Sequence, residues 1–352
     1  MNCADRRRQC GAATLAVTVL LLLSLGLAML YAARVAVVEQ RLAANDARAR
    51  AALAAAQAGA AATLAGLGAV DRAAIVYDTD GRATVSAGTG TLANGAGFRA
   101  EAHNRGLSPY QAEVLRLDVQ GSSPGGGTRA LTLLAAFTSQ LPNVPPAPLL
   151  VRGDLAPAAA LVLSNPVRSV AAWLGGVNTA GVPPETQLPA AAACLPIGIC
   201  AEDTRLAALT PEGFAANTFG RTPAAVRAAA RVLRCAPCEP AALTAAGDLL
   251  WLENDGAAVS LTAGALGTAA RPVIAVVAGD FAPAGDVQVY GLLFVLGDWR
   301  AGTGTLSVDG ALIIAGQALD VGPAVLNYHA GILDRLHARG DYGAVPGSWT
   351  DL

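Results

Sequence analysis

The sequence predicts an α+β protein, in which a long N-terminal transmembrane α-helix packs on an antiparallel β-sheet and a β-rich, solenoid-like C-terminal region follows. Three observations predict this fold. An uncharged, leucine-rich segment near the N-terminus continues without a break into alanine-rich helical sequence. Short segments of strand type come next. Apolar runs then recur near the C-terminus at an almost constant spacing.

Composition limits the classes of function before any motif is considered. Hydrophobic residues make up 53% of the 352 residues and charged residues 14%, with a formal net charge of −2. All 24 basic residues are arginine. A nucleic-acid-binding protein needs a basic face that neutralises phosphates, so we expect no nucleic-acid partner.

The N-terminal segment has the pattern of a membrane anchor. Three arginines, Arg6 to Arg8, precede 25 residues without a charge, and the stretch from Gly11 to Ala33 contains eight leucines. On the insertion scale, eight leucines contribute about −4 kcal/mol. The 23 residues of this stretch span about 34 Å, enough to cross a bilayer core. We therefore expect a single span, with the arginines on the cytoplasmic side and the remainder of the chain on the other.

A removable secretory signal is the alternative interpretation of this segment. The apolar run exceeds the roughly 7–15 residues of such a signal, and no small-residue cleavage site follows it. Alanine-rich sequence instead favours one helix over residues 12–66. Within the span, Gly26, Ala28 and Ala32 are small enough to let another helix approach closely.

Three short motifs along this helix resemble a known family. They are Arg8–Ala13 (RQCGAA), Val38–Asp46 (VEQRLAAND) and Ala54–Gly59 (AAAQAG). They resemble the R-Q-x-G-A, E-E/Q-R-M/L-A-x-N and A-x-x-A-A-E/Q-A segments of PilX-like type IV pilus assembly proteins, a minor pilin-like family. The resemblance covers about residues 6–60 and extends loosely to Pro346–Trp349.

The resemblance implies a non-enzymatic subunit for type IV pilus assembly. A prepilin peptidase would remove a basic leader, residues 1–11, by cutting between Gly11 and Ala12. The ectodomain would face the periplasm from a single-pass anchor in inner membrane lipid, and other pilins or minor pilins would be its partners in a surface pilus. Ala16 would occupy the fifth mature position, where major pilins have glutamate, which suits a subunit at the pilus tip.

Two alternatives stay open at this point. The first is a minor pseudopilin of a type II secretion system, which also lacks glutamate at the fifth mature position. A membrane-tethered adhesive or carbohydrate-binding module would use the helix only as a tether. An enzyme is not expected, because no nucleophile elbow, H-E-x-x-H motif or phosphate-binding glycine loop occurs. We expect neither a cofactor nor a metal.

Residues 67–140 are predicted to form an antiparallel β-meander that packs on the helix. The segments of strand type are Ala73–Asp78, Ala83–Gly88, Gly97–Asn104, Glu113–Gln120 and Thr128–Ser139. The glycine-rich segment Gly121–Gly127 is predicted to be the hairpin loop between the last two.

A proline cluster then begins a mixed insert over residues 141–260. Thr222 as N-cap and Pro223 at the first helical position predict a helix that continues to Leu233.

Four cysteines lie in this insert, on the oxidising side of the membrane: Cys194, Cys200, Cys235 and Cys238. Disulfides are the default expectation there. Local pairing of the first two and of the last two is the simplest connectivity, and the cross-pairings remain open. The C-x-x-C spacing also occurs in thiol-redox and zinc sites, but here it follows a predicted helix rather than a strand.

Residues 261–352 are predicted to form a β-repeat region with a C-terminal cap. Three apolar runs end at Gly279, Gly297 and Gly316, a spacing of 18 and then 19 residues. Shorter alternating strands, Asp286–Tyr290 and Thr305–Asp309, lie between them. One apolar and one alternating strand per turn predict stacked solenoid rungs, and an antiparallel meander is the alternative.

Two further features belong to this region. Asp280 and Asp298 follow matching glycines, so they are predicted to be turn residues, with a paired carboxylate or calcium site as the alternative. The segment Leu326–Leu336 is predicted to be a helix that caps the open end of the stack.

Overall fold

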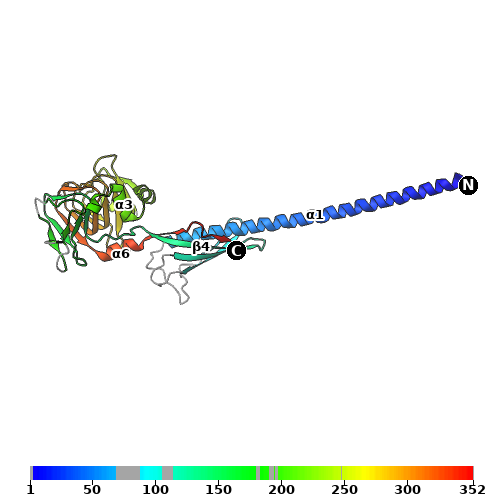
Figure 1. The fold of residues 1–352 in the computed structure, drawn as a ribbon, viewed down its shortest axis with the longest axis horizontal. Coiled ribbons are helices and arrows are strands. Elements are labelled where there is room, and N and C mark those ends of the chain that lie inside the picture. Colours follow the sequence, from blue (N-terminus) through cyan, green and yellow to red (C-terminus); the bar gives the residue numbers. More distant parts are fainter. Residues whose placement is uncertain are drawn as a thin grey trace. The chain divides into compact units, whose positions relative to one another are not determined.

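The computed structural model describes residues 3–68, 88–104, 114–179, 183–189, 194, 197–246 and 248–351 (Figure 1). The chain divides into two compact units. The first unit comprises Met1–Leu67, Ile75–Ala136 and Tyr342–Leu352, and the second comprises Gly68–Ala74 and Phe137–Asp341. The fold is α+β, with one long N-terminal helix, an antiparallel sheet and further strands.

Helix α1 (Cys3–Gly68) is one continuous element, as the sequence predicts. From Thr14 to Arg48 every residue is exposed, whereas from Ala49 onward one face of the helix is buried. The buried stripe recurs every three or four residues, which is the spacing of one helix face. Its members are Ala52, Ala55, Ala56, Gly59, Ala60, Thr63 and Leu67.

The sheet of the first unit lies against this stripe. Its strands are β1 (Thr89–Thr91), β2 (Gly97–Asn104), β3 (Val114–Ser122), β4 (Thr128–Ser139), β19 (Gly340–Ala344) and β20 (Thr350–Asp351). Strands β1 to β4 pair in chain order and antiparallel, and both β19 and β20 pair with β4. The predictions for β2 and β4 are confirmed. The predicted strands before Gly88 lie outside the described residues.

Small residues allow the helix to approach the sheet closely. At Gly121, at the end of β3, a Cβ atom would lie 2.6 Å from the backbone nitrogen of Ala56 and would also overlap the carbonyl oxygen of Ala52. On Gly59 of the helix, a Cβ would overlap the ring of Phe98. The sheet contributes the larger apolar side chains to this core, including Leu115, Leu117, Val119, Leu131 and Leu133.

The second unit consists of parallel strands arranged in ladders. The first ladder contains, in order, β10 (Ile199–Cys200), β8 (Ala172–Leu174), β5 (Leu149–Val151), β16 (Leu306–Ile314), β15 (Val287–Val295), β14 (Val273–Val277), β12 (Leu249–Glu253) and β11 (Arg231–Arg234). The second ladder contains β13 (Gly264–Leu266), β15, β16, β18 (Ala324–Tyr328), β7 (Leu161–Ser164) and β9 (Glu185–Gln187). A short pair joins β17 (Ala318–Val321) to β6 (Leu155–Pro157). Because the pairing is parallel, the antiparallel meander considered for residues 261–352 is wrong.

Strands β15 and β16 each belong to both ladders and bend at a glycine. Gly291 and Gly310 have φ values of 136° and 144°, a conformation that side chains disfavour. A Cβ on Gly310 would also overlap the carbonyl oxygen of Gly291 on the neighbouring strand. The alternating and apolar strands predicted as separate elements are therefore one bent strand in each repeat.

The order of strands along the ladders differs from the order along the chain. The early strand β5 pairs with the late strand β16, and β7 pairs with β18. The two regions that the sequence analysis treats as separate, residues 141–260 and 261–352, therefore share one set of ladders. The last residues, from Tyr342, belong to the first unit instead.

The described residues of the second unit also form five short helices: α2 (Thr204–Ala207), α3 (Pro211–Phe219), α4 (Pro223–Ala229), α5 (Pro240–Ala246) and α6 (Ala330–Ala338). Side chains from α3, α4 and α6 form a second core cluster on one face of the first ladder. Every residue of β14 is consequently buried, which explains the continuous apolar runs.

Two helix predictions need correction. Helix α4 begins at Pro223 with Thr222 as its N-cap, as expected, but it ends at Ala229 because the next residues form β11 beside β12. The helix predicted over Leu326–Leu336 begins only at Ala330, because Ala324–Tyr328 form β18. Helix α6 also does not cap the end of the stack. Leu333 and Leu336 pack with residues of β14, β15 and β16 on the face of the first ladder.

Candidate functional site

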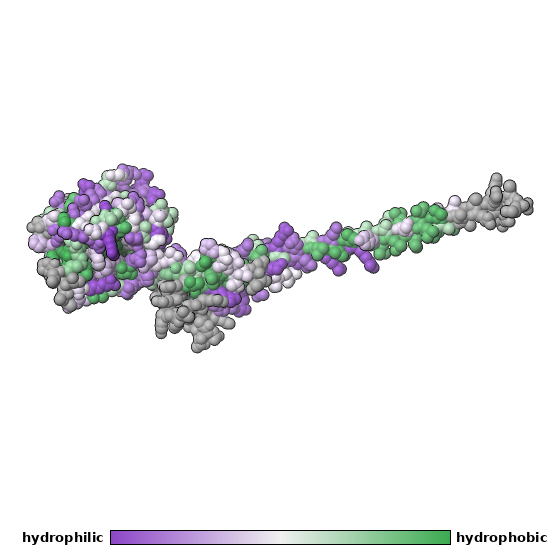
Figure 2. Space-filling model, viewed as in Figure 1, coloured by the Kyte–Doolittle hydropathy of each residue, from purple (hydrophilic) through white to green (hydrophobic). Residues whose placement is uncertain are grey.

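The most distinctive surface of the first unit is the bare part of α1. From Leu15 to Tyr31 its large side chains are all exposed, and Figure 2 shows this apolar surface in green. By length and composition, α1 is able to cross a membrane, and none of its most apolar window is buried. Exposure of these leucines to water is unfavourable by about 25 cal/mol for each Å² of apolar accessible surface. This surface requires a lipid or protein environment.

The small residues expected to pack against another helix do not lie on one face. Ala28 and Ala32 are one turn apart on the same side of α1, whereas Gly26 lies two residues before Ala28, on the opposite side. A Cβ on Gly26 would meet no described atom within 4 Å. Gly11 and Ala12 lie inside α1, and their surroundings are outside the described part of the structure.

Charged residues mark the end of the apolar surface. Arg34 follows the uncharged stretch, and an ion pair joins Arg50 to Asp46 one turn away, at 2.7 Å. Between Arg34 and Arg48 the helix is exposed on all sides. A connecting segment of about 20 Å thus separates the apolar surface from the part of α1 that the sheet covers.

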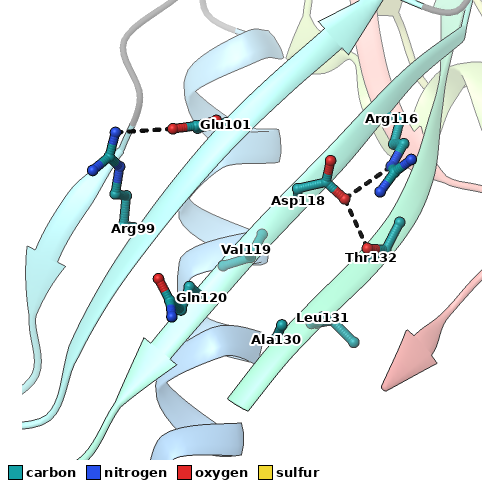
Figure 3. A pocket seen from close by; sticks show the side chains of 9 residues that line it. All are labelled: Arg99, Glu101, Arg116, Asp118, Val119, Gln120, Ala130, Leu131 and Thr132. Carbon is teal, nitrogen blue, oxygen red and sulfur yellow. Dashed lines mark hydrogen bonds and ion pairs between the residues drawn. The ribbon is translucent and has the colours of Figure 1, made fainter. Parts of the chain in front are cut away.

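A second candidate site lies on the face of the sheet that points away from α1. Side chains of β2, β3 and β4 line a shallow cavity of about 480 Å³ (Figure 3). Asp118 accepts hydrogen bonds from Arg116 Nε at 2.9 Å and from Thr132 Oγ1 at 2.7 Å. Arg99 pairs with Glu101 at 2.9 Å. The sequence analysis assigned no role to these residues.

The charges in this cavity compensate one another. Glu101 lies directly opposite Asp118, and the imidazole of His103 approaches both carboxylates, at 3.8 Å and 3.5 Å. Ion pairs this exposed contribute about 0–1 kcal/mol each. The arrangement fits a solvated sheet surface better than a site for a charged ligand.

The four cysteines form two local disulfides. Cys194 is bonded to Cys200, and Cys235 is bonded to Cys238. Cys200 lies in β10 and Cys235 follows β11, and these are the two terminal strands of the first ladder. Each disulfide therefore closes a loop at one end of the first ladder. The terminal strand at that end pairs with only one other strand of the ladder.

The glycine–aspartate pairs are turn residues that connect successive repeats. Asp280 Oδ1 accepts a hydrogen bond from the backbone N–H of Asp298, and Asp298 Oδ1 accepts one from Gln317, both at 2.9 Å. Asp154 makes the same bond to Val177, at 2.9 Å. This earlier corner was missed, although Arg152-Gly153-Asp154 follows an apolar run just as the later ones do. Within the described ranges, no group of three or more His, Cys, Asp or Glu side chains is arranged to hold a metal.

Three of the four tryptophans have structural environments, and Trp349 is exposed. Trp251 and Trp299 are buried, and Trp173 donates its indole N–H to Asp203 at 2.9 Å. This hydrogen bond is the main cause of the lowered pKa of Asp203. Asp203 also caps α2 by accepting from the backbone N–H groups of Arg205 and Leu206.

Comparison with known proteins gives little similarity. No protein-family model matches the sequence, and no curated protein is significantly similar to it. Among solved structures, the competence-associated pilin ComZ from Thermus thermophilus aligns over 87% of this chain and 98% of its own, with 11% sequence identity and a TM-score of 0.27. That TM-score is too low for a conclusion about this chain, so α1 and its sheet remain the basis for a function.

Proposed function

We propose that this chain is a non-enzymatic, minor pilin-like subunit of type IV pilus assembly, related to PilX-like proteins. One observation carries the proposal. A single uninterrupted helix is apolar and bare over its first part, and its last part is packed by small residues on an antiparallel sheet. The same rod can thus lie in a membrane and hold a folded unit outside it.

The division of α1 suits transfer from lipid into a bundle of helices. The sheet covers the helix only from Ala49 onward, so the segment from Thr14 to Arg34 can leave the bilayer without disturbing the sheet. In a filament, the exposed leucines would pack against the equivalent helices of other pilins. Contacts of these leucines with lipid would be replaced by contacts with protein. Removal of the helix from the bilayer therefore need not expose its apolar surface to water.

In this proposal the short N-terminus is cytoplasmic, the span lies in the inner membrane and both units face the periplasm. The charge pattern supports this orientation, with Arg6, Arg7 and Arg8 before the span. The two disulfides suit an oxidising compartment. A prepilin peptidase would cut between Gly11 and Ala12.

We also propose that the second unit is a β-solenoid. Successive parallel strands support this, because each apolar run stacks in register on the next: Ala275 on Leu293, and Leu293 on Leu312. The backbone hydrogen bonds between the corner glycines Gly279, Gly297 and Gly316 repeat in the same way, at 3.0 Å.

Substitution of the leader glycine tests the assembly proposal. Gly11→Val should block leader removal, because a side chain is introduced at the proposed cleavage site, and the subunit should then be absent from pili. Immunoblots of membrane and sheared-pilus fractions, with N-terminal sequencing of the membrane form, measure both effects. Ala13→Val is the matched control and should be processed.

Normal processing and piliation in Gly11→Val would contradict the leader assignment. Deletion of the gene separates the alternatives. Loss of secretion with normal pili would point to the pseudopilin, and normal pili with normal secretion would point to a tethered adhesive module.

A further inference from the structure

A row of polar side chains crosses the second ladder. The strand registers align five outward-facing residues across neighbouring strands: Tyr290, Asp309, Asn327, Ser164 and Gln187. The residue before each of them in the central strands, such as Val308 and Leu326, belongs to the hydrophobic core. At about 4.8 Å between strands, the row is about 19 Å long.

The centre of this row is held in a fixed arrangement. Asp309 accepts one hydrogen bond from Gln288 Nε2 at 3.0 Å and another from Asn327 Nδ2 at 3.1 Å. Both bonds run between neighbouring strands, so the carboxylate and two amides are positioned before any ligand arrives. A carboxylate has about four lone-pair sites, which leaves about two for hydroxyl groups of a ligand.

A recess adjoins the row at Gln288. Its volume is about 350 Å³, and its lining includes Gly264, Ala265, Asp286, Thr305 and Ser307. The recess arises because β13 contributes only glycine and alanine beside the longer side chains of β15. Small-ligand sites have volumes of about 300–1,000 Å³, so this recess can hold one or two sugar rings.

The chemistry of these residues selects the ligand class. The row and the recess together contain two carboxylates, Asp286 and Asp309, and no arginine or histidine, which disfavours an anionic polymer. Few apolar side chains are present, which disfavours a lipid or an apolar peptide. Amides, carboxylates and hydroxyls match a ligand rich in hydroxyl groups, and the ring of Tyr290 offers an apolar surface to a sugar face.

We propose that this face binds a neutral polysaccharide, with the chain along the row and one sugar unit in the recess. The site does not depend on the assembly proposal, because it uses no residue of α1 or of the first unit. A pilus subunit and a tethered module could both carry it.

Binding of purified full-length protein to glycans tests the proposal. The protein is kept in a detergent without a sugar headgroup and is mixed with insoluble cellulose, chitin and starch, and with polygalacturonate as the anionic control. Sedimentation measures capture, and calorimetry with the matching soluble hexasaccharide measures affinity. We expect capture by at least one neutral polymer and none by polygalacturonate.

Variants locate the site. Asp309→Asn removes the central acceptor charge and should weaken hexasaccharide binding by roughly tenfold or more. Tyr290→Ala removes the stacking surface, and Ser307→Tyr fills the recess. Both should reduce binding to a similar extent. Glu212→Gln, a carboxylate neutralised on the exposed surface of α3, is the matched control and should bind like the native chain.

Absence of binding to all three neutral polymers would overturn the proposal, as would equal capture by polygalacturonate. Unchanged affinity in Asp309→Asn and Ser307→Tyr would do the same. Circular dichroism monitors folding. If Asp309→Asn fails to fold, the affinity of Ser307→Tyr alone tests the location of the site. Leader processing should be normal in every folded variant, which separates this test from that of the assembly proposal.

Discussion

The two parts of α1 belong to one helix but have opposite surroundings. Both are rich in alanine and both are helical, yet residues from Thr14 to Arg48 are exposed whereas one face of Ala49–Leu67 is buried. The difference lies in side-chain size. Leucine, valine and methionine give the bare part many large side chains, and alanine or glycine occupies most of the buried stripe, where the sheet approaches the helix backbone.

This comparison shows that helix propensity makes α1 one continuous helix, while side-chain volume determines what each part of it can pack against. Large aliphatic side chains suit lipid, which adapts to any shape. Small side chains suit a sheet whose own leucines already fill the space. Three substitutions in α1 test this division, from the largest expected effect to the smallest.

A charge in the bare part should have the largest effect. Leu22→Arg replaces a contribution of about −0.5 kcal/mol by a penalty of about 3 kcal/mol at the centre of the span. The expected result is loss of stable insertion, measured as the fraction of protein that alkaline carbonate extracts from membranes. Leu42→Arg, beyond Arg34, is the control and should remain inserted. If Leu22→Arg resists extraction as well as the control does, the bare part is not the span.

Added volume in the buried stripe should destabilise the first unit. Ala56→Leu introduces three carbons where Gly121 already contacts the helix backbone, and overpacking of this kind costs about 1–3 kcal/mol. Hydrogen exchange of the β2, β3 and β4 amides measures the loss. Ala28→Leu is the same substitution in the bare part and should leave that exchange unchanged. Equal effects of both substitutions would remove the distinction between the two parts.

Loss of the ion pair near the boundary should have the smallest effect. Asp46→Asn removes the ion pair with Arg50. The side chain of Asp46 is 58% exposed and that of Arg50 is 80% exposed. Pairs of this kind on a helix surface contribute about 0.3–0.5 kcal/mol, and salt screens them. Amide exchange between Leu42 and Arg50 should rise slightly at low ionic strength and be unaffected at high ionic strength. A change above about 1 kcal/mol would show that the connecting segment is held by more than surface charge.

Sequence patterns predicted the elements with local signals. The charge-free run and the alanine-rich sequence predicted α1, segments of strand type predicted β2 and β4, and Thr222-Pro223 predicted the start of α4. The same signal at Thr210-Pro211 begins α3 and was overlooked. The role of Gly26, Ala28 and Ala32 in helix packing stays a prediction, and their spacing places Gly26 on a different helix face from the two alanines.

Long-range pairing had no such signal. Nothing local to Leu149–Val151 indicates that it pairs with β16, more than 150 residues later. Helix α6 has an apolar face, but its sequence does not specify whether that face covers the side or the end of the ladders. The polar row on the second ladder is also invisible in sequence, because its five residues come from five separate strands. Only the register brings them together.

Two hydrogen bonds in the second unit have a mechanical consequence. They join residues near the two ends of the segment Phe137–Asp341. Ser139 Oγ donates to the carbonyl of His337 at 2.7 Å, and the N–H of Gln140 donates to the carbonyl of Arg339 at 2.8 Å. Tension that pulled the two ends of this segment apart would therefore act on these bonds before it reached the ladders.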